Sequence, residues 1–219
     1  MAARWVTFDC FGTLVDWHTG FTAVLGDIAG DRLPDFLKAY HQHERFAELE
    51  RPHRLYRDVV EAAVRRAAGA LGMPVTDEQA TALPRSWGTL PVFPDVEAEL
   101  AALRAAGCRL AVLTNCDNDL FAETQKHFRH PFDLVVTAED VKDYKPAPAH
   151  LRRFFRVSGV DLDAWVHVAC SFYHDVGPAK QMGVKRVWVD RDRTGEDPAW
   201  ATARLPDARG LAAAVTALL

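Results

Sequence analysis

Cysteine is scarce in this chain of 219 residues, with only four in total. They show neither CxxC spacing nor the density of a disulfide framework (Cys10, Cys108, Cys116 and Cys170). The sequence therefore predicts a protein of a reducing compartment, most simply the cytoplasm. Three of the cysteines (Cys10, Cys116 and Cys170) follow three different predicted strands, which leaves a soft-metal site as the lesser alternative to buried packing residues.

Long apolar runs and an excess of positive charge are also lacking. No uninterrupted apolar stretch reaches the length of a membrane span, and the start Met-Ala-Ala-Arg-Trp leads directly into the first motif, which predicts no signal peptide. The net charge of −4 argues against a nucleic-acid or anionic-membrane partner. With 49% hydrophobic residues, however, the chain can bury a substantial core.

Helical and strand patterns alternate from residue 95 onward. Apolar runs predict strands near 110–113, 134–136, 165–169 and 187–189, the last of the set. Amphipathic stretches predict helices between and after them, near 96–106, 118–128, 149–157, 176–182 and 211–218. This alternation predicts an α/β fold with a doubly wound, parallel, Rossmann-like sheet.

A long helical segment interrupts this alternation. After a first strand near residues 6–8, the stretch from about 19 to 87 carries apolar residues at helical spacing and no convincing strand. We therefore expect a helical cap domain inserted into the core. The predicted division assigns 1–14 and 92–219 to the Rossmann-like core and 15–91 to the cap.

The stretch from Trp5 to Asp16 carries the strongest motif. Its apolar run ends at Asp9, and Gly12 and Thr13 then mark a turn. A carboxylate at the carboxyl end of a strand is well placed to act as a nucleophile. The pattern Asp-x-x-Gly-Thr resembles the first motif of the haloacid dehalogenase-like hydrolases, which implies that Asp9 is the nucleophile. The family's phosphatases carry a second Asp two positions later, but this chain has Phe11, which favours substitution at carbon over phosphoryl transfer.

Three later motifs follow in the order of that family, so the resemblance extends over essentially the whole chain. Thr114-Asn115 after an apolar strand resembles the second motif, Lys145 resembles the third-motif lysine, and Asp175 resembles the retained acid of the fourth. Each motif is weak alone, whereas four in order are specific. The predicted catalytic residues are Asp9, Lys145 and Asp175.

The chemistry of these residues supports the same assignment. A nearby ammonium such as Lys145 would keep Asp9 ionised and orient it, and Asp175 could activate a water molecule. Hydroxyl and amide groups around the turn could hold a substrate carboxylate, and we assign this binding role to Cys10, Phe11, Thr13, Thr114 and Asn115. Two local alternatives stay open: Lys145 as a surface lysine beside a proline, and Asp175 as the N-cap of the following helix.

Several positions depart from the 2-haloacid dehalogenases, the branch that lacks the second Asp. The cap arginine of that branch aligns with Ala39, and other expected polar residues are replaced by Leu151, Cys170 and Phe172. The nearest replacements for the arginine are His41, Arg45 and Arg51. We expect His41 and Arg45, one helical turn apart, to contact the leaving group or anion, although a solvated helical face is the alternative. Trp17 could line an apolar pocket with Phe11 and Tyr173, and the alternative is that all three are ordinary core or hinge aromatics.

The predicted function is therefore that of a hydrolase like the 2-haloacid dehalogenases. It would displace halide from a small 2-halo carboxylic acid through an aspartyl ester on Asp9, with no metal and no cofactor. A Mg²⁺-dependent phosphatase acting on a small phosphate ester is the first alternative, and a non-catalytic binding protein of the same fold is the second. The expected partner is the small carboxylic acid substrate, and a homodimer is left open.

Overall fold

A computed structural model describes residues 3–219. A single six-stranded sheet forms the core, with every neighbouring pair parallel and the order β3-β2-β1-β4-β5-β6. The predicted α/β fold with a doubly wound parallel sheet is confirmed. The strands are β1 (Arg4–Phe8), β2 (Cys108–Thr114), β3 (Leu134–Thr137), β4 (Trp165–Ala169), β5 (Lys185–Val189) and β6 (Ala203–Leu205).

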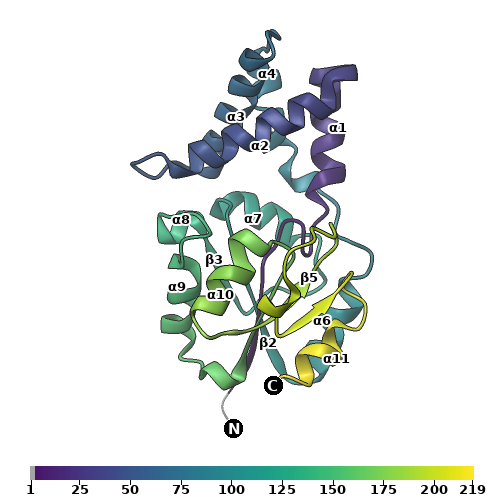
Figure 1. The fold of residues 1–219 in the computed structure, drawn as a ribbon, viewed down its shortest axis with the longest axis vertical. Coiled ribbons are helices and arrows are strands. Elements are labelled where there is room, and N and C mark those ends of the chain that lie inside the picture. Colours follow the sequence, from purple (N-terminus) through teal and green to yellow (C-terminus); the bar gives the residue numbers. More distant parts are fainter. Residues whose placement is uncertain (1–2) are drawn as a thin grey trace.

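Helices cover both faces of the sheet (Figure 1). One face carries α6 (Glu97–Ala105) and α11 (Leu211–Thr216), and the other carries α9 (Ala149–Ser158) and α10 (Gly177–Gln181). Alternate side chains of each strand point to opposite faces, so both sides of the sheet must be apolar to bury it. In β1, Val6 and Phe8 pack with the first pair of helices, while Trp5 packs edge-on against Phe154 of α9.

A separate helical lobe lies over the carboxyl ends of the strands (Figure 1). Its helices are α1 (Trp17–Ala29), α2 (Leu33–Leu49), α3 (Tyr56–Ala70) and the short α4 (Asp77–Ala80) and α5 (Ala82–Arg85). The helix-rich character predicted for residues 19–87 agrees with these elements. The extent 15–91 stays our proposal for the cap domain, and we call this lobe the cap.

Two sequence-based boundaries are wrong. Helix α7 (Asn118–Gln125) ends before residue 128, because from Lys126 the backbone makes tighter bonds to the third preceding carbonyl. The strand near 187–189 is not the last, because β6 follows it at the sheet edge. That strand has three residues and is only partly buried, so it produces no apolar run. The remaining short elements are α8 (Ala138–Val141), a π-helical turn (Phe172–Val176) and isolated 3₁₀ turns.

The core also caps a helix of the lobe. The buried Asp117 carboxylate accepts the backbone N–H groups of Tyr56 (2.6 Å) and Arg57 (3.0 Å), the first two residues of α3. It thereby satisfies N–H groups that a helix start leaves unpaired. Asp117 directly precedes α7, but its side chain makes no capping bond to that helix. None of the helices within residues 3–219 has the length and apolarity needed to cross a membrane.

Candidate active site

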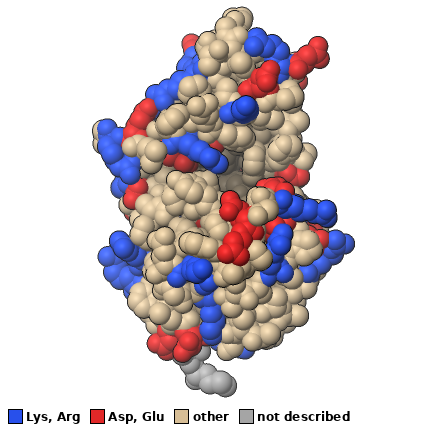
Figure 2. Space-filling model, in the orientation of Figure 1, with Lys and Arg blue, Asp and Glu red and all other residues tan. Residues whose placement is uncertain are grey.

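A cavity of about 420 Å³ lies between the cap and the carboxyl ends of the strands. Figure 2 shows the hollow between the two parts, with acidic side chains gathered along its edge. Both parts of the chain contribute to its lining. The core supplies Asp9, Phe11, Thr114, Asn115, Lys145 and Asp175, and the cap supplies Trp17, His41, Glu44, Arg45, Glu48 and Tyr56, among others.

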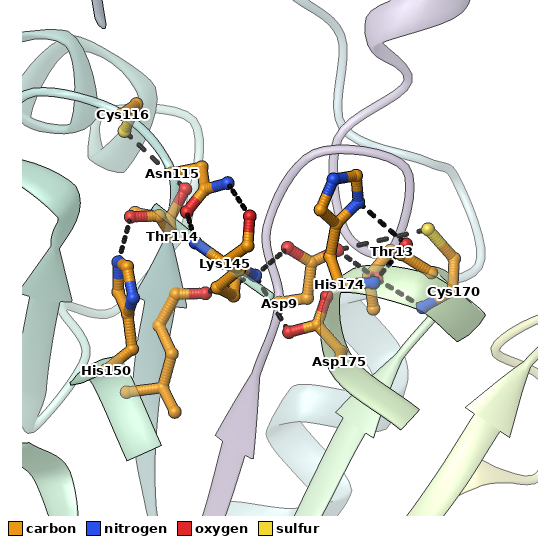
Figure 3. Close-up of polar contacts among 12 residues, drawn as sticks. Asp9, Thr13, Thr114, Asn115, Cys116, Lys145, His150, Cys170, His174 and Asp175 are labelled. Atoms are coloured by element: carbon orange, nitrogen blue, oxygen red, sulfur yellow. Dashed lines mark hydrogen bonds and ion pairs between the residues drawn. The ribbon is translucent and has the colours of Figure 1, made fainter. Parts of the chain in front are cut away.

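Asp9, Lys145 and Asp175 meet at the floor of this cavity (Figure 3). The Lys145 Nζ donates to Asp9 Oδ1 at 2.7 Å and to Asp175 Oδ1 at 2.8 Å, and its third bond goes to the Leu113 carbonyl at 3.0 Å. Burial alone would lower the pKa of Lys145, but the charges of Asp175 and Asp9 outweigh it and raise that pKa above its usual value. The lysine is therefore a buried ammonium, and the surface-lysine alternative is wrong.

Asn115 holds this lysine in place through its backbone. The Asn115 Oδ1 accepts the Lys145 N–H at 2.7 Å, and the Asn115 Nδ2 donates to the Lys145 carbonyl at 3.2 Å. The pair of bonds fixes the segment that carries Lys145 against the end of β2. Within the structure, this side chain therefore serves to position Lys145.

The second oxygen of Asp9 is held by the turn that follows β1. Thr13 Oγ1 donates to Asp9 Oδ2 at 2.7 Å and accepts the backbone N–H of Cys170 at 2.8 Å. Gly12 has a φ of 92°, and a Cβ there would lie 2.7 Å from the Cys170 Sγ. Only glycine fits this turn without displacing the cysteine, which explains the Gly-Thr pair of the motif. Thr13 does not line the cavity, so its side chain positions Asp9.

Asp175 receives a second donor that sequence analysis missed. His167 Nε2 lies 3.1 Å from Asp175 Oδ1, and its Nδ1 lies 2.8 Å from the Thr7 hydroxyl. Because a carboxylate only accepts, His167 donates from Nε2 to Asp175, and the Thr7 hydroxyl beside Nδ1 also accepts Trp165 Nε1–H at 2.8 Å. One feature of the sequence could have indicated this contact. Thr7 and His167 are polar residues within two apolar strands, β1 and β4, and they lie opposite each other in the sheet.

The other oxygen of Asp175 is free. Asp175 Oδ2 is buried and has no hydrogen-bond partner anywhere in residues 3–219. Burial alone would raise the pKa of Asp175, but Lys145 and His167 lower it below its usual value, so the group is ionised. The alternative that it caps the following helix is wrong, because Ser171 caps the π-helical turn and Asp175 lies within that turn.

Two predicted substrate contacts offer no free polar side-chain group to the cavity. Cys10 is fully buried and contributes no side-chain surface to the lining, and burial raises the pKa of its thiol. Thr114 reaches the cavity wall, but its hydroxyl is directed to the Cys116 Sγ at 3.6 Å, and His150 Nε2 lies 3.1 Å from its carbonyl. For Cys10, only the backbone could serve the predicted role. No group of three or more His, Cys, Asp or Glu within residues 3–219 is arranged to hold a metal ion.

Two of the three cap residues considered for the leaving group reach the cavity. His41 and Arg45 both line it, and Arg51 instead bonds Asp143 at 2.8 Å. His41 packs edge-on against Trp17, with ring centroids 5.0 Å apart, and the Arg45 guanidinium lies 5.9 Å from the Tyr173 ring centre. Of the departures from the family pattern, Cys170 and Phe172 line the cavity, whereas Leu151 lies on the buried face of α9 and packs in the core.

Comparisons with known proteins agree with this architecture. The model of the haloacid dehalogenase-like hydrolase family matches residues 3–183. Haloacetate dehalogenase H-2 from Moraxella is 24% identical over 204 residues, covering 88% of this chain and 90% of that protein. Phosphoserine phosphatase from Thermus thermophilus is 37% identical over 123 residues, but this match covers 55% of this chain and only 49% of that protein.

Solved structures are similar over the full length. The L-2-haloacid dehalogenase RSc1362 superimposes with a TM-score of 0.86 at 25% identity, covering 99% of this chain and 100% of that one. The L-2-haloacid dehalogenase from Xanthobacter autotrophicus was solved with chloropropionic acid covalently bound. It gives a TM-score of 0.82 at 19% identity and covers 99% of this chain and 100% of that one. Given the family match, the four ordered motifs and the shared fold, the chain belongs to the haloacid dehalogenase-like hydrolases.

Proposed function

We propose that this protein is a metal-independent 2-haloacid dehalogenase that acts through an ester on Asp9. The observation that carries the proposal is the arrangement of the Asp9 carboxylate at the cavity floor. Lys145 and Thr13 hold its two oxygens, and the residue two positions later, Phe11, lines the same cavity with an aromatic ring. The Phe11 ring packs edge-on against the Trp87 ring, with the ring centroids 4.9 Å apart. This position therefore supplies no acid to the cavity.

In the first step, an oxygen of Asp9 attacks the carbon that bears the halogen. The new carbon–oxygen bond forms as the carbon–halogen bond breaks, and the electron pair leaves with the halide. Lys145 pairs with the attacking carboxylate at 2.7 Å and orients it within a buried site. The apolar walls formed by Phe11 and Trp17 would exclude water from the reacting carbon during this step.

In the second step, the ester is hydrolysed at the Asp9 carbonyl carbon. The free Oδ2 of Asp175 is placed to take a proton from a water molecule, whose oxygen then attacks the carbonyl. The bond between the carbonyl carbon and the ester oxygen breaks, and the leaving oxygen takes the proton that remained on the attacking oxygen. This releases a 2-hydroxy acid and restores the Asp9 carboxylate, and Asp175 passes its proton to solvent. His167 and Lys145 hold Asp175 through its other oxygen, leaving Oδ2 available.

The phosphatase alternative is less well supported by these residues. Phosphoryl transfer in this family needs an acid at the position of Phe11, and a hard oxygen ligand would suit Mg²⁺ better than the Cys170 thiol that stands at the cavity wall. The sequence matches to phosphoserine phosphatase and phosphoglycolate phosphatase also cover only about half of each of those proteins. We further propose a small carboxylic acid as the substrate. We also propose the cytoplasm as the compartment, because all four cysteines are free thiols.

Halide release with and without EDTA tests the proposed function. Purified protein incubated with 2-chloropropionate is expected to release chloride at the same rate in both conditions, because no step uses a metal. A phosphomonoester such as p-nitrophenyl phosphate is expected to give no phosphate release above background, with or without Mg²⁺. Strictly Mg²⁺-dependent phosphate release would establish the phosphatase instead, and loss of both activities would leave a binding protein.

We also predict that His41 and Arg45 act on turnover more than on stability. Arg45→Ala and His41→Ala are each expected to lower kcat/KM for 2-chloropropionate at least about tenfold, equivalent to about 1.4 kcal/mol, because both side chains line the cavity. The melting temperature should change little, since both are polar side chains at a partly open surface. Lys38→Ala, an exposed position on the same helix, is the matched control. Wild-type kinetics in both cavity variants would exclude the leaving-group role.

A further inference from the structure

The cap wall of the cavity carries two carboxylates. Glu44 and Glu48 lie one turn apart on α2, and both side chains line the cavity above the Asp9 site. Glu48 is buried and Glu44 is half-buried, and two such acids facing the nucleophile are costly unless each has a partner. Their partners therefore indicate what the cap wall is able to bind.

Both carboxylate oxygens of Glu44 have hydrogen-bond partners. Its Oε1 accepts the hydroxyls of Tyr40 (3.0 Å) and Tyr56 (2.6 Å), and its Oε2 lies 3.2 Å from His41 Nδ1. Burial alone would raise the pKa of Glu44, but these partners lower it below its usual value. Glu44 is therefore a fixed negative charge with its hydrogen-bonding capacity in use.

Within the described residues, only one carboxylate oxygen of Glu48 has a hydrogen-bond partner. The side chain is buried, with 9% of the residue exposed, and its one partner is Asn115 Nδ2, 3.4 Å from Oε1. In the part of the chain that the structure describes, no hydrogen bond reaches Oε2. The same region provides no ion pair for Glu48, and the nearby Arg45 lies over the Tyr173 ring instead. A buried carboxyl group thus lines the cavity with one oxygen unused.

The charge state of Glu48 follows from its neighbours. Burial, followed by the charge of Glu44, raises the pKa of Glu48 to about 9, although Lys145, Asn115 and Arg45 act in the opposite direction. At neutral pH the group is protonated when no cation is beside it. A cation that entered the cavity would favour the ionised form, and the released proton would pass to solvent.

The subsite lies close to the reacting centre. Asn115, which contacts Glu48, also clamps the backbone of Lys145, and Lys145 bonds Asp9. One small molecule can therefore present its reacting carbon to Asp9 and its far end to Glu48. The chemistry at that far end must suit a carboxyl group beside a fixed negative charge, which disfavours a second carboxylate or a phosphate.

We propose that Glu48, supported by Glu44, binds a primary ammonium group at the far end of the substrate, so that the preferred substrates are 2-halo acids with an ω-amino group. This inference rests on the proposed dehalogenase function and specifies its substrate class. An ammonium supplies three hydrogen-bond donors and a positive charge, which matches the free oxygen of Glu48 and the neighbouring Glu44 carboxylate.

Paired substrates test this inference. Chloride release is measured for ω-amino-2-chloro acids of four to six carbons and for unsubstituted 2-chloro acids of matching length, with 2-chloroadipate as the dianionic comparison. For the best chain length, the wild-type protein is expected to show at least about a tenfold higher kcat/KM for the amino substrate than for its apolar match. The dianion is expected to be the slowest of the three.

Variants assign that preference to Glu48. In Glu48→Gln the ratio of the two kcat/KM values is expected to fall to about one, and in Glu48→Asp, which withdraws the carboxyl group, to fall part of the way. Glu50→Gln is the matched control, because this exposed carboxylate bonds Arg54 and Arg66 outside the cavity. Its ratio should equal that of the wild type. Equal rates for both substrates in the wild type, or a ratio unchanged in Glu48→Gln, would overturn the inference.

A binding measurement separates this inference from the dehalogenase proposal. Calorimetry with 6-aminohexanoate and hexanoate, which carry no halogen, is expected to show at least about tenfold tighter binding of the amino acid to wild-type protein and no such difference for Glu48→Gln. If no substrate releases chloride but the binding difference is present, the dehalogenase proposal fails and the ammonium subsite stands. If chloride is released and the binding difference is absent, the subsite is wrong.

Discussion

Asp9→Asn is expected to lower the steady-state rate of halide release by at least about 10⁴-fold, the scale on which enzymes lose turnover when a covalent nucleophile is removed. The amide that replaces the carboxylate carries no negative charge and is a far weaker nucleophile towards carbon. Its neighbours Lys145 and Thr13 cannot restore that charge, because both act as donors to the carboxylate. Chloride release from 2-chloropropionate under initial-rate conditions provides the measurement.

Controls must show that Asp9→Asn loses activity because the nucleophile is gone and not because the protein unfolds. Asparagine has nearly the shape of aspartate, so the fold of Asp9→Asn is expected to persist, as judged by far-ultraviolet circular dichroism and the melting temperature. Asp27→Asn, an exposed aspartate on α1, controls for the substitution itself and should retain wild-type turnover. A folded Asp9→Asn protein that releases halide at the wild-type rate would show that Asp9 is not the nucleophile.

Asp175→Asn is expected to fail at the second step. Halide should appear in a burst of about one equivalent per active site, followed by a steady rate lower by about 10³-fold, within the range that general bases contribute. The reason is that attack on carbon requires only the oriented Asp9 carboxylate, whereas hydrolysis of the ester requires a base near its carbonyl. Rapid-quench measurement of chloride, with the 2-hydroxy acid measured in parallel, distinguishes the two steps.

The burst amplitude is the decisive quantity for Asp175. A variant with both substitutions, Asp9→Asn and Asp175→Asn, should give no burst, because no ester can form. If Asp175→Asn instead slows halide release in the first turnover as much as in later ones, Asp175 acts on the attack itself. That result would be consistent with a role in holding Lys145, which it contacts at 2.8 Å.

Much of the fold and the central triad could be predicted from the sequence, because both depend on local patterns. Buried parallel strands appear as short apolar runs, and the runs of β1, β2, β3 and β5 each end at a polar residue. Parallel strands bring their carboxyl ends to one edge of the sheet. That rule brings together Asp9, directly after β1, and Asp175, in the turn after β4, although 166 residues separate them in the chain. Lys145 lies in the segment between α8 and α9, and its place beside both carboxylates was predicted from the motif order.

The cap side of the cavity could not be predicted in the same way. A polar helix face is compatible with solvent or with a cavity, and only the packing of α2 against α3 shows that Glu44 meets Tyr56 and that Glu48 is buried. The same limit applies to Asp117, whose partners at the start of α3 lie about sixty residues away in sequence. Side-chain direction within a turn was also hidden, which is why Cys10 was assigned to the substrate.

The most direct test of the account is intact-protein mass spectrometry of Asp175→Asn after mixing with 2-chloropropionate. We expect one adduct with the mass of the substrate minus hydrogen chloride, mapped by peptide fragmentation to Asp9, and none in Asp9→Asn. The neighbouring thiol of Cys10 is buried and its pKa is raised, so it should stay unmodified. An adduct on Cys10, or halide release by Asp175→Asn without any adduct on Asp9, would contradict the ester mechanism.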